Sequence, residues 1–226
     1  MYKIITLASS ILCVIVLAKA QEGKSNKILN RFELVAGPSF SNNSGYLPDY
    51  DSKAGYSFGV GYYQNLSKSF SFNFRISYEM KGSAATYSYG LTDDNGNVDL
   101  DDKYTIKFKY LTFYVLPTLQ LGQNKNIYVS AGGYYSFLQD LSVNSYRTRT
   151  DTGEFFSEDT TTDRNYFDPT YDAGVSFLFG YSFKAGEKSL LMLQAFVNRG
   201  LIDLHNPATG SQRNNTLGLM ISFRMR

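Results

Sequence analysis

Residues 69–82 alternate strictly between apolar and polar side chains, and this is the clearest pattern in the chain. Successive side chains of an extended chain point to opposite sides, so a period of two residues predicts a strand. One face of this strand is apolar and the other is polar. The apolar face consists of Phe70, Phe72, Phe74, Ile76, Tyr78 and Met80, and the polar face of Ser71, Asn73, Arg75, Ser77, Glu79 and Lys81.

Seven further segments are predicted to be strands, and several exceed the five or six residues that are usual in globular sheets. A strand that crosses a membrane at a tilt needs about 9–11 residues. These lengths favour strands that cross a membrane. The eight predicted strands are residues 31–40, 55–63, 69–82, 104–121, 127–139, 171–184, 189–200 and 216–226.

The connections between these strands alternate between long and short. The short ones are residues 66–68, 122–126 and 185–188, and the long ones are 41–54, 83–103, 140–170 and 201–215. Outer-membrane barrels combine short periplasmic turns with long extracellular loops, whereas a soluble eight-stranded barrel gives no reason for this asymmetry. We predict an all-β fold, namely an eight-stranded antiparallel up-and-down transmembrane β-barrel with both mature termini in the periplasm.

The N-terminus has the features of a cleaved signal peptide, predicted for residues 1–20. Lys3 supplies its positive charge, an apolar run follows, and small residues precede the cleavage site. Cleavage between Ala20 and Gln21 leaves residues 21–226 as one outer-membrane β-barrel domain. The predicted location is the outer membrane of a Gram-negative bacterium, where the protein contacts lipid.

The composition supports β-structure and excludes some chemistry. The chain has 19 Tyr, 17 Phe and 19 Gly but no Trp, and aromatic residues are frequent in strands. Its single cysteine, Cys13, lies in the predicted signal peptide, so the mature protein has no disulfide or thiol. Removing Lys3 and Lys19 with that peptide leaves 20 basic and 20 acidic residues. This balanced charge offers no electrostatic surface for nucleic acid.

The inward positions of the predicted strands carry charged residues. An eight-stranded barrel is just wide enough inside for its own side chains, and a buried charge without a partner is very costly. We therefore hypothesise a structural polar network that fills the lumen, made of Glu33, Arg75, Glu79, Lys81, Gln194, Asn198 and Arg224. In the fourth strand, Lys107 and Lys109 share the outward parity of Leu111, so either a bulge intervenes or these lysines lie above the bilayer.

No catalytic, cofactor-binding or metal-ligating residue is predicted. His205 lies in the fourth long connection with Ser211 nearby, but a catalytic triad is defined by geometry rather than by proximity in the chain. The acidic run 93–102 lacks the pattern of an EF-hand, because Val98 and Tyr104 stand where Gly and Glu are needed. A membrane-embedded hydrolase is therefore the least favoured function.

The second and third long connections are expected to extend the barrel wall. Asn95-Gly96 has the sequence of a tight hairpin turn, and residues 142–150 and 155–163 alternate like strands around Asp151-Thr152-Gly153. Exposed strand edges are templates for pairing with another chain. These loops are the predicted site of contact with an envelope or extracellular protein partner.

Several blocks of the sequence resemble PorT-type outer-membrane barrels, a family common in Bacteroidota. The blocks are Ser77-Tyr78-Glu79-Met80-Lys81-Gly82, Tyr110-Leu111, Tyr128-Val129-Ser130-Ala131-Gly132-Gly133-Tyr134-Tyr135, Asp172-Ala173-Gly174 and Gly200-Leu201-Ile202-Asp203-Leu204. Their order and spacing imply the same barrel fold. Arg75 departs from the family's frequent acidic residue and Tyr114 from its frequent proline, and the chain ends on Arg226 rather than on an aromatic residue. One founding member is associated with a secretion system, a role that does not extend to every member.

Two functions are expected ahead of a hydrolase. The favoured one is a non-enzymatic, monomeric barrel without a cofactor, in a structural, envelope or secretion-accessory role. The alternative is a surface receptor or adhesin that binds partners through loops 2 and 3, which are the connections 83–103 and 140–170. A lumen filled by side chains argues against a wide diffusion pore.

Overall fold

The computed structural model describes residues 31–45, 51–93, 96–149, 155–161, 170–186, 189–206 and 210–225. The predicted signal peptide and its cleavage between Ala20 and Gln21 lie outside the described residues. In the described part of the chain, no helix is long and apolar enough to cross a membrane.

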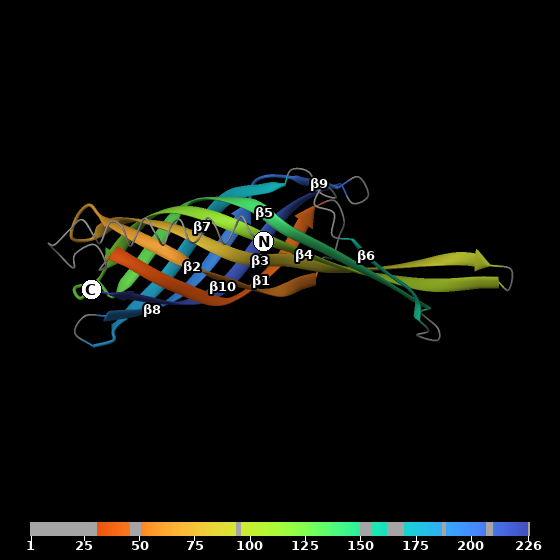
Figure 1. Ribbon diagram of the computed structural model, residues 1–226, viewed down its shortest axis with the longest axis horizontal. Helices are drawn as coiled ribbons and strands as arrows, with labels where there is room; N and C mark the ends of the chain where they lie inside the picture. The colour runs from red at the N-terminus through yellow and green to blue at the C-terminus, as the bar shows by residue number, and fades with distance from the viewer. Residues whose placement is uncertain are drawn as a thin grey trace, which may run out of the picture.

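Eight antiparallel strands close into a barrel (Figure 1), which confirms the predicted fold class. Strand β1 pairs with both β2 and β10, so the sheet closes on itself. The wall consists of β1 (Phe32–Gly45), β2 (Asp51–Asn65), β3 (Phe70–Asp93), β4 (Gly96–Leu121), β5 (Ile127–Arg149), β7 (Tyr171–Lys184), β8 (Ser189–Gly200) and β10 (Gly210–Met225). Two shorter strands lie outside this ring, because β6 (Phe155–Thr161) pairs with β5 and β9 (Leu204–Asn206) pairs with β10.

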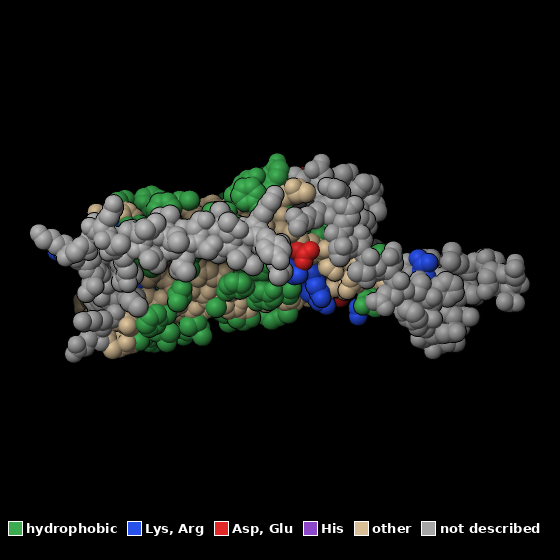
Figure 2. Space-filling model, viewed as in Figure 1, with side chains coloured by type: hydrophobic (Ala, Val, Ile, Leu, Met, Phe, Trp, Pro, Cys, Tyr) green, Lys and Arg blue, Asp and Glu red, His purple; other side chains and the backbone are tan. Residues whose placement is uncertain are grey.

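Apolar side chains cover the outside of the barrel. Leu219 is 64% exposed, whereas its neighbour Met220 points inward and is 6% exposed. The same alternation runs through β3 as the sequence predicts, with Phe74 outside and Arg75 inside. Figure 2 shows the apolar side chains as a broad band on the barrel. A water-soluble protein would bury these side chains in its core. Because they are exposed on the outside of the barrel, they form the surface that contacts lipid.

Two strands match their predicted limits and most others are longer. Strands β7 and β8 begin and end where the alternation does. The prediction of a long loop over 41–54 was wrong, because β1 continues to Gly45 and β2 begins at Asp51. Ser41 and Asn43 in this extension are buried. The hydrophobic pattern stops there while the backbone pairing continues, so the sequence pattern ended the strand too early.

Strands β3 and β4 form an arm that extends far beyond the barrel (Figure 1). Their pairing runs without interruption from Phe70 opposite Leu119 to Asp93 opposite Gly96. Strand β5 follows the base of the arm as far as Arg149. This confirms that the second and third connections extend the barrel wall. The predicted turn at Asn95-Gly96 was misplaced, because Gly96 is paired within β4.

The lysines of β4 keep the outward parity of Leu111, and the bulge beside them lies in the neighbouring strand β5. Lys109 pairs with Asp140 and Tyr110 pairs with Leu138, so Gln139 is an extra residue in β5 rather than in β4. Lys109 points outward and binds Asp140 at 2.6 Å. Figure 2 shows charged side chains at this end of the apolar band, where a lipid-facing charge costs little.

Glycines inside the barrel make room for large side chains on the neighbouring strand. Gly180 lies directly opposite Tyr128, and a Cβ atom at position 180 would lie 2.3 Å from the Tyr128 ring. Gly61 lies opposite Glu33, whose carboxylate would lie 2.5 Å from a Cβ atom there. These pairs of a small and a large residue let the narrow barrel close around a filled interior.

Replacing Gly180 with valine is expected to destabilise the barrel by about 1–3 kcal/mol, because the added side chain overpacks the space that Tyr128 fills. Unfolding by guanidinium in detergent micelles measures this change. Gly133→Val is the matched control, since the nearest atom to a Cβ atom there lies 3.7 Å away. Equal stability of the two variants would contradict the packing argument.

Candidate functional site

Buried ion pairs in the described part of the barrel interior belong to two groups of side chains, of which the first surrounds Arg75. Arg75 donates from one guanidinium nitrogen to Glu33 at 2.8 Å and to Gln194 at 2.9 Å. Asn73 also donates to Glu33 at 2.9 Å, and Gln194 donates to Ser222 at 2.7 Å. This Arg75 cluster links β1, β3, β8 and β10, which include the two strands that close the barrel.

The second group, the Lys81 cluster, lies where β3, β4, β5 and β7 face one another. The Lys81 ammonium group is 3.2 Å from Asp172 and 3.7 Å from Glu79. It also lies over the ring of Tyr134, 4.6 Å from its centroid. Tyr114 donates a hydrogen bond of 2.5 Å to Glu79. A buried lysine is thus held by two carboxylates and by the face of an aromatic ring.

Neutral donors support the carboxylates of the Lys81 cluster. Asp172 accepts hydrogen bonds from Tyr134 and Asn214 in addition to Lys81. Asn198 donates to Tyr114 at 2.8 Å and so orients the hydroxyl group that binds Glu79. Such donors are needed because a charge removed from water must be both paired and hydrogen-bonded.

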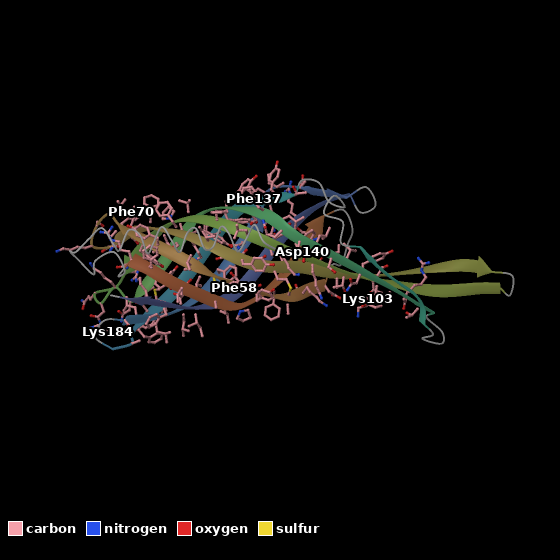
Figure 3. The ribbon with its side chains drawn as sticks, in the orientation of Figure 1. Phe58, Phe70, Lys103, Phe137, Asp140 and Lys184 are labelled. Atoms are coloured by element: carbon pink, nitrogen blue, oxygen red, sulfur yellow. The ribbon has the colours of Figure 1, made fainter. Side chains whose placement is uncertain are left out.

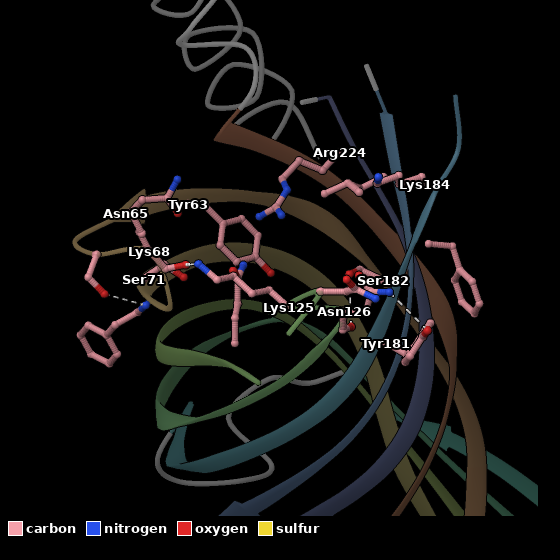
Figure 4. A pocket seen from close by; sticks show the side chains of 16 residues that line it. Tyr63, Asn65, Lys68, Ser71, Lys125, Asn126, Tyr181, Ser182, Lys184 and Arg224 are labelled. Carbon is pink, nitrogen blue, oxygen red and sulfur yellow. Dashed lines mark hydrogen bonds between the residues drawn. The ribbon is translucent and has the colours of Figure 1, made fainter. Parts of the chain in front are cut away.

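The structure brings six of the seven proposed network residues into these two clusters. Figure 4 shows the seventh, Arg224, at the barrel mouth instead. Its guanidinium group stacks over the ring of Tyr63 at 4.3 Å. Of the other six, Glu33, Arg75 and Gln194 belong to the Arg75 cluster. Glu79 and Lys81 contact each other in the Lys81 cluster, which Asn198 joins through Tyr114.

Sequence reasoning missed several members of the clusters. Asn73 and Asp172 could have been found, since both share the inward parity of their strands. Tyr114 and Tyr134 were harder to recognise, because an aromatic residue in a barrel strand is usually taken to face lipid. The assembled barrel places the two hydroxyl groups beside carboxylates of neighbouring strands. Tyr114 binds Glu79 and Tyr134 binds Asp172 inside the barrel.

The lumen is more apolar than the proposed polar network implied. Buried side chains such as Val35, Met192 and Phe196 form an apolar cluster beside the polar groups. A second apolar cluster at the base of the arm contains Phe108 and Leu141, both fully buried. Polar and apolar side chains therefore fill the interior together.

His205 is the single histidine of the sequence and lies in the short hairpin of β9 and β10. The backbone of His205 pairs there with the backbone of Ser211. In the same connection Arg213 binds Asp203 through two hydrogen bonds, of 2.5 and 3.4 Å. The hydrogen bond from Arg213 lowers the pKa of Asp203 below its usual value. The carboxylate nearest His205 in sequence is thus engaged by an arginine. The described residues include no group of three or more His, Cys, Asp or Glu side chains that could hold a metal ion.

A closed barrel with an apolar outer surface and buried ion pairs defines an integral β-barrel membrane protein. The chain belongs to the outer membrane protein beta-barrel domain family, whose model matches residues 20–206. It is therefore a barrel of the Gram-negative outer membrane. No curated protein matches its sequence.

Solved structures with a similar fold include three outer-membrane proteins. Ail, the attachment invasion locus protein of Yersinia pestis, is 9% identical with a TM-score of 0.37, covering 86% of this chain and 97% of that chain. OprG from Pseudomonas aeruginosa is 14% identical with a TM-score of 0.37, covering 86% and 94%. The outer membrane protease OmpT from Escherichia coli is 6% identical with a TM-score of 0.40, covering 88% and 97%.

Proposed function

We propose that this chain is a non-enzymatic surface barrel that binds a protein partner through the β3–β4 arm. The observation that carries this proposal is an unpaired strand edge. Strand β3 pairs with β2 only as far as Ala84, and in the described part of the chain its remaining residues to Asp93 pair with β4 alone. A free edge offers backbone donors and acceptors to an added strand of another protein.

The arm points to the outside of the cell in the proposed orientation, with both mature termini in the periplasm. The turns at 66–69 and 122–126 are short and lie at the end of the barrel opposite the arm, where β7 also ends at Lys184. Figure 3 shows Phe70 and Lys184 at that end and Lys103 towards the arm. Short turns on the periplasmic side and long extensions outside are usual for outer-membrane barrels.

The filled interior supports a role without transport or catalysis. Large side chains such as Phe108, Leu116 and Met192 are buried inside together with the two ion-paired clusters. A pore would need a water-filled path through these side chains. The protein acts through its surface in this proposal, as a monomer that needs no cofactor.

A structural or secretion-accessory role of the PorT type is the second candidate, and a convergence of sequence blocks favours it. Lys81, Tyr110, Tyr134 and Asp172 come from four separate blocks that resemble the Bacteroidota family. They meet around one ammonium group, which lies 3.2 Å from Asp172 and over both aromatic rings. If this chain shares its barrel core with that family, the blocks that build such a buried cluster are the ones expected to be similar.

Removing the arm is expected to abolish partner binding and to leave the barrel folded. Thr86 pairs with Lys103, so replacing residues 86–103 with Asn-Gly joins the paired residues Ala85 and Tyr104 by a hairpin turn. Cross-linking on intact cells, followed by identification of the linked proteins, measures binding. Heat-modifiable gel mobility reports whether the barrel has folded.

A matched control changes a different connection between barrel strands. Asp203→Asn combined with Arg213→Gln removes the ion pair between the β8–β9 connection and β10 but keeps the arm. This control is expected to retain the cross-linked partner. An unchanged set of partners after removal of the arm would refute the proposed binding site.

A further inference from the structure

The barrel has a cavity of about 990 Å³ at its mouth, on the side of the short turns. Figure 4 shows it from close by, with side chains from the β2–β3 and β4–β5 connections and from the adjoining ends of β7 and β8 around it. Inward residues at the ends of β2, β3 and β10 line its inner wall. In the proposed orientation this mouth opens to the periplasm.

The charge around this cavity has one sign. Lys68, Lys125, Lys184 and Arg224 line it, and its described lining residues include no carboxylate. The remaining polar groups of the lining are amides and hydroxyls that can donate hydrogen bonds. The chain as a whole is nearly neutral, so its net charge does not repel anions. The four cations make the electrostatic potential in the cavity positive, and the cavity therefore attracts anions.

Two of these cations are held in place by the protein. Arg224 stacks over the ring of Tyr63, 4.3 Å from its centroid. Lys125 has a positive φ of 52° and donates to the backbone carbonyl of Lys68 at 2.6 Å, which ties two turns together across the mouth (Figure 4). A cation that is positioned in advance loses less conformational entropy when it binds a ligand.

A buried hydroxyl group in the same cavity lacks a partner. Ser71 lines the cavity and is 2% exposed, and its Oγ atom makes no hydrogen bond within the protein. A buried polar group without a partner costs free energy. A ligand oxygen in the mouth would accept this hydrogen bond.

We propose that the barrel mouth binds a phosphate group. Phosphate offers several strong acceptor oxygens and up to two negative charges, which suit a guanidinium fork, ammonium groups and a hydroxyl donor. The phosphate group belongs either to a free phosphate ion or to the headgroup of a phospholipid. This site does not involve the arm, and it relies on the proposed function only for the side of the membrane that it faces.

Titration calorimetry on the full mature chain in a neutral detergent tests the site. Inorganic phosphate is one probe, and glycerophosphoglycerol, the headgroup of phosphatidylglycerol, is the other. Tighter binding of inorganic phosphate identifies the free ion, and tighter binding of glycerophosphoglycerol identifies a lipid source. Absence of binding by both probes would overturn the proposal, whatever the arm binds.

Three variants locate the site. Lys125→Gln combined with Arg224→Gln is expected to weaken binding by at least about tenfold, because charge-assisted hydrogen bonds are lost. Ser71→Ala is expected to weaken it about threefold while leaving the charge unchanged. Lys103→Gln combined with Lys107→Gln removes two cations near the arm and is expected to bind phosphate normally. An equal loss in this control would show attraction by overall charge and would overturn the proposed site.

Discussion

Replacing Arg75 with alanine is expected to lower the free energy of unfolding by about 3–5 kcal/mol, the cost of removing one partner from a buried ion pair. Glu33, which is 1% exposed, would lose its only cationic contact at 2.8 Å among the described residues. Gln194 would lose its donor in the same step. Guanidinium unfolding in detergent micelles measures the loss, and heat-modifiable gel mobility shows whether the barrel still forms.

The double variant Arg75→Ala with Glu33→Gln separates charge from packing. Neutralising Glu33 removes the uncompensated buried charge, so this variant is expected to be more stable than Arg75→Ala alone. If Arg75→Ala alone had the stability of the native protein, the Arg75 cluster would not be what holds the barrel closed. That result would also count against the structural network hypothesised from the sequence.

Replacing Lys81 with methionine is expected to be at least as severe. Methionine keeps much of the volume, but Asp172 and Glu79 would remain inside the barrel without the ammonium group that now lies 3.2 and 3.7 Å away. A loss of about 3–5 kcal/mol is expected. The measurement is again guanidinium unfolding, with Lys107→Met as a control at an outward position.

A compensating change tests whether charge is the cause. Lys81→Met combined with Asp172→Asn removes one of the two stranded carboxylates and is expected to recover part of the lost stability. If the added Asp172→Asn change lowers stability further, the hydrogen bonds of Asp172 to Tyr134 and Asn214 matter more than its charge. The control Lys107→Met is expected to stay close to the native stability.

The two clusters and the arm have separate roles in the proposed function: the clusters stabilise the barrel and the arm binds the partner. The clusters join strands that are far apart in sequence, for example β3 with β7 through Lys81 and Asp172. A wall held together in this way needs no contribution from the arm, whose outer part pairs only within itself in the described residues. The arm can therefore bind a partner without disturbing the contacts that hold the barrel together.

Much of the barrel was predictable because one physical rule acts along each strand. Lipid outside and a packed interior impose alternation, so the parity of Phe74, Arg75 and Leu219 could be read directly. The rule fails where both faces are polar. Ser41 and Asn43 continue β1 by backbone pairing, and no hydrophobic signal marks them.

The sequence by itself determined which segments form the strands, their inward and outward faces and the places of the short turns, because these depend on neighbours along the chain. Only the tertiary structure decided which inward groups meet. Lys81 and Asp172 are 91 positions apart, and closure of the barrel brings them together. The same closure gathers Lys68 and Lys125 from two turns and Lys184 from the end of β7 around one mouth. Such contacts depend on the register between strands, which the periodicity of a single strand does not contain.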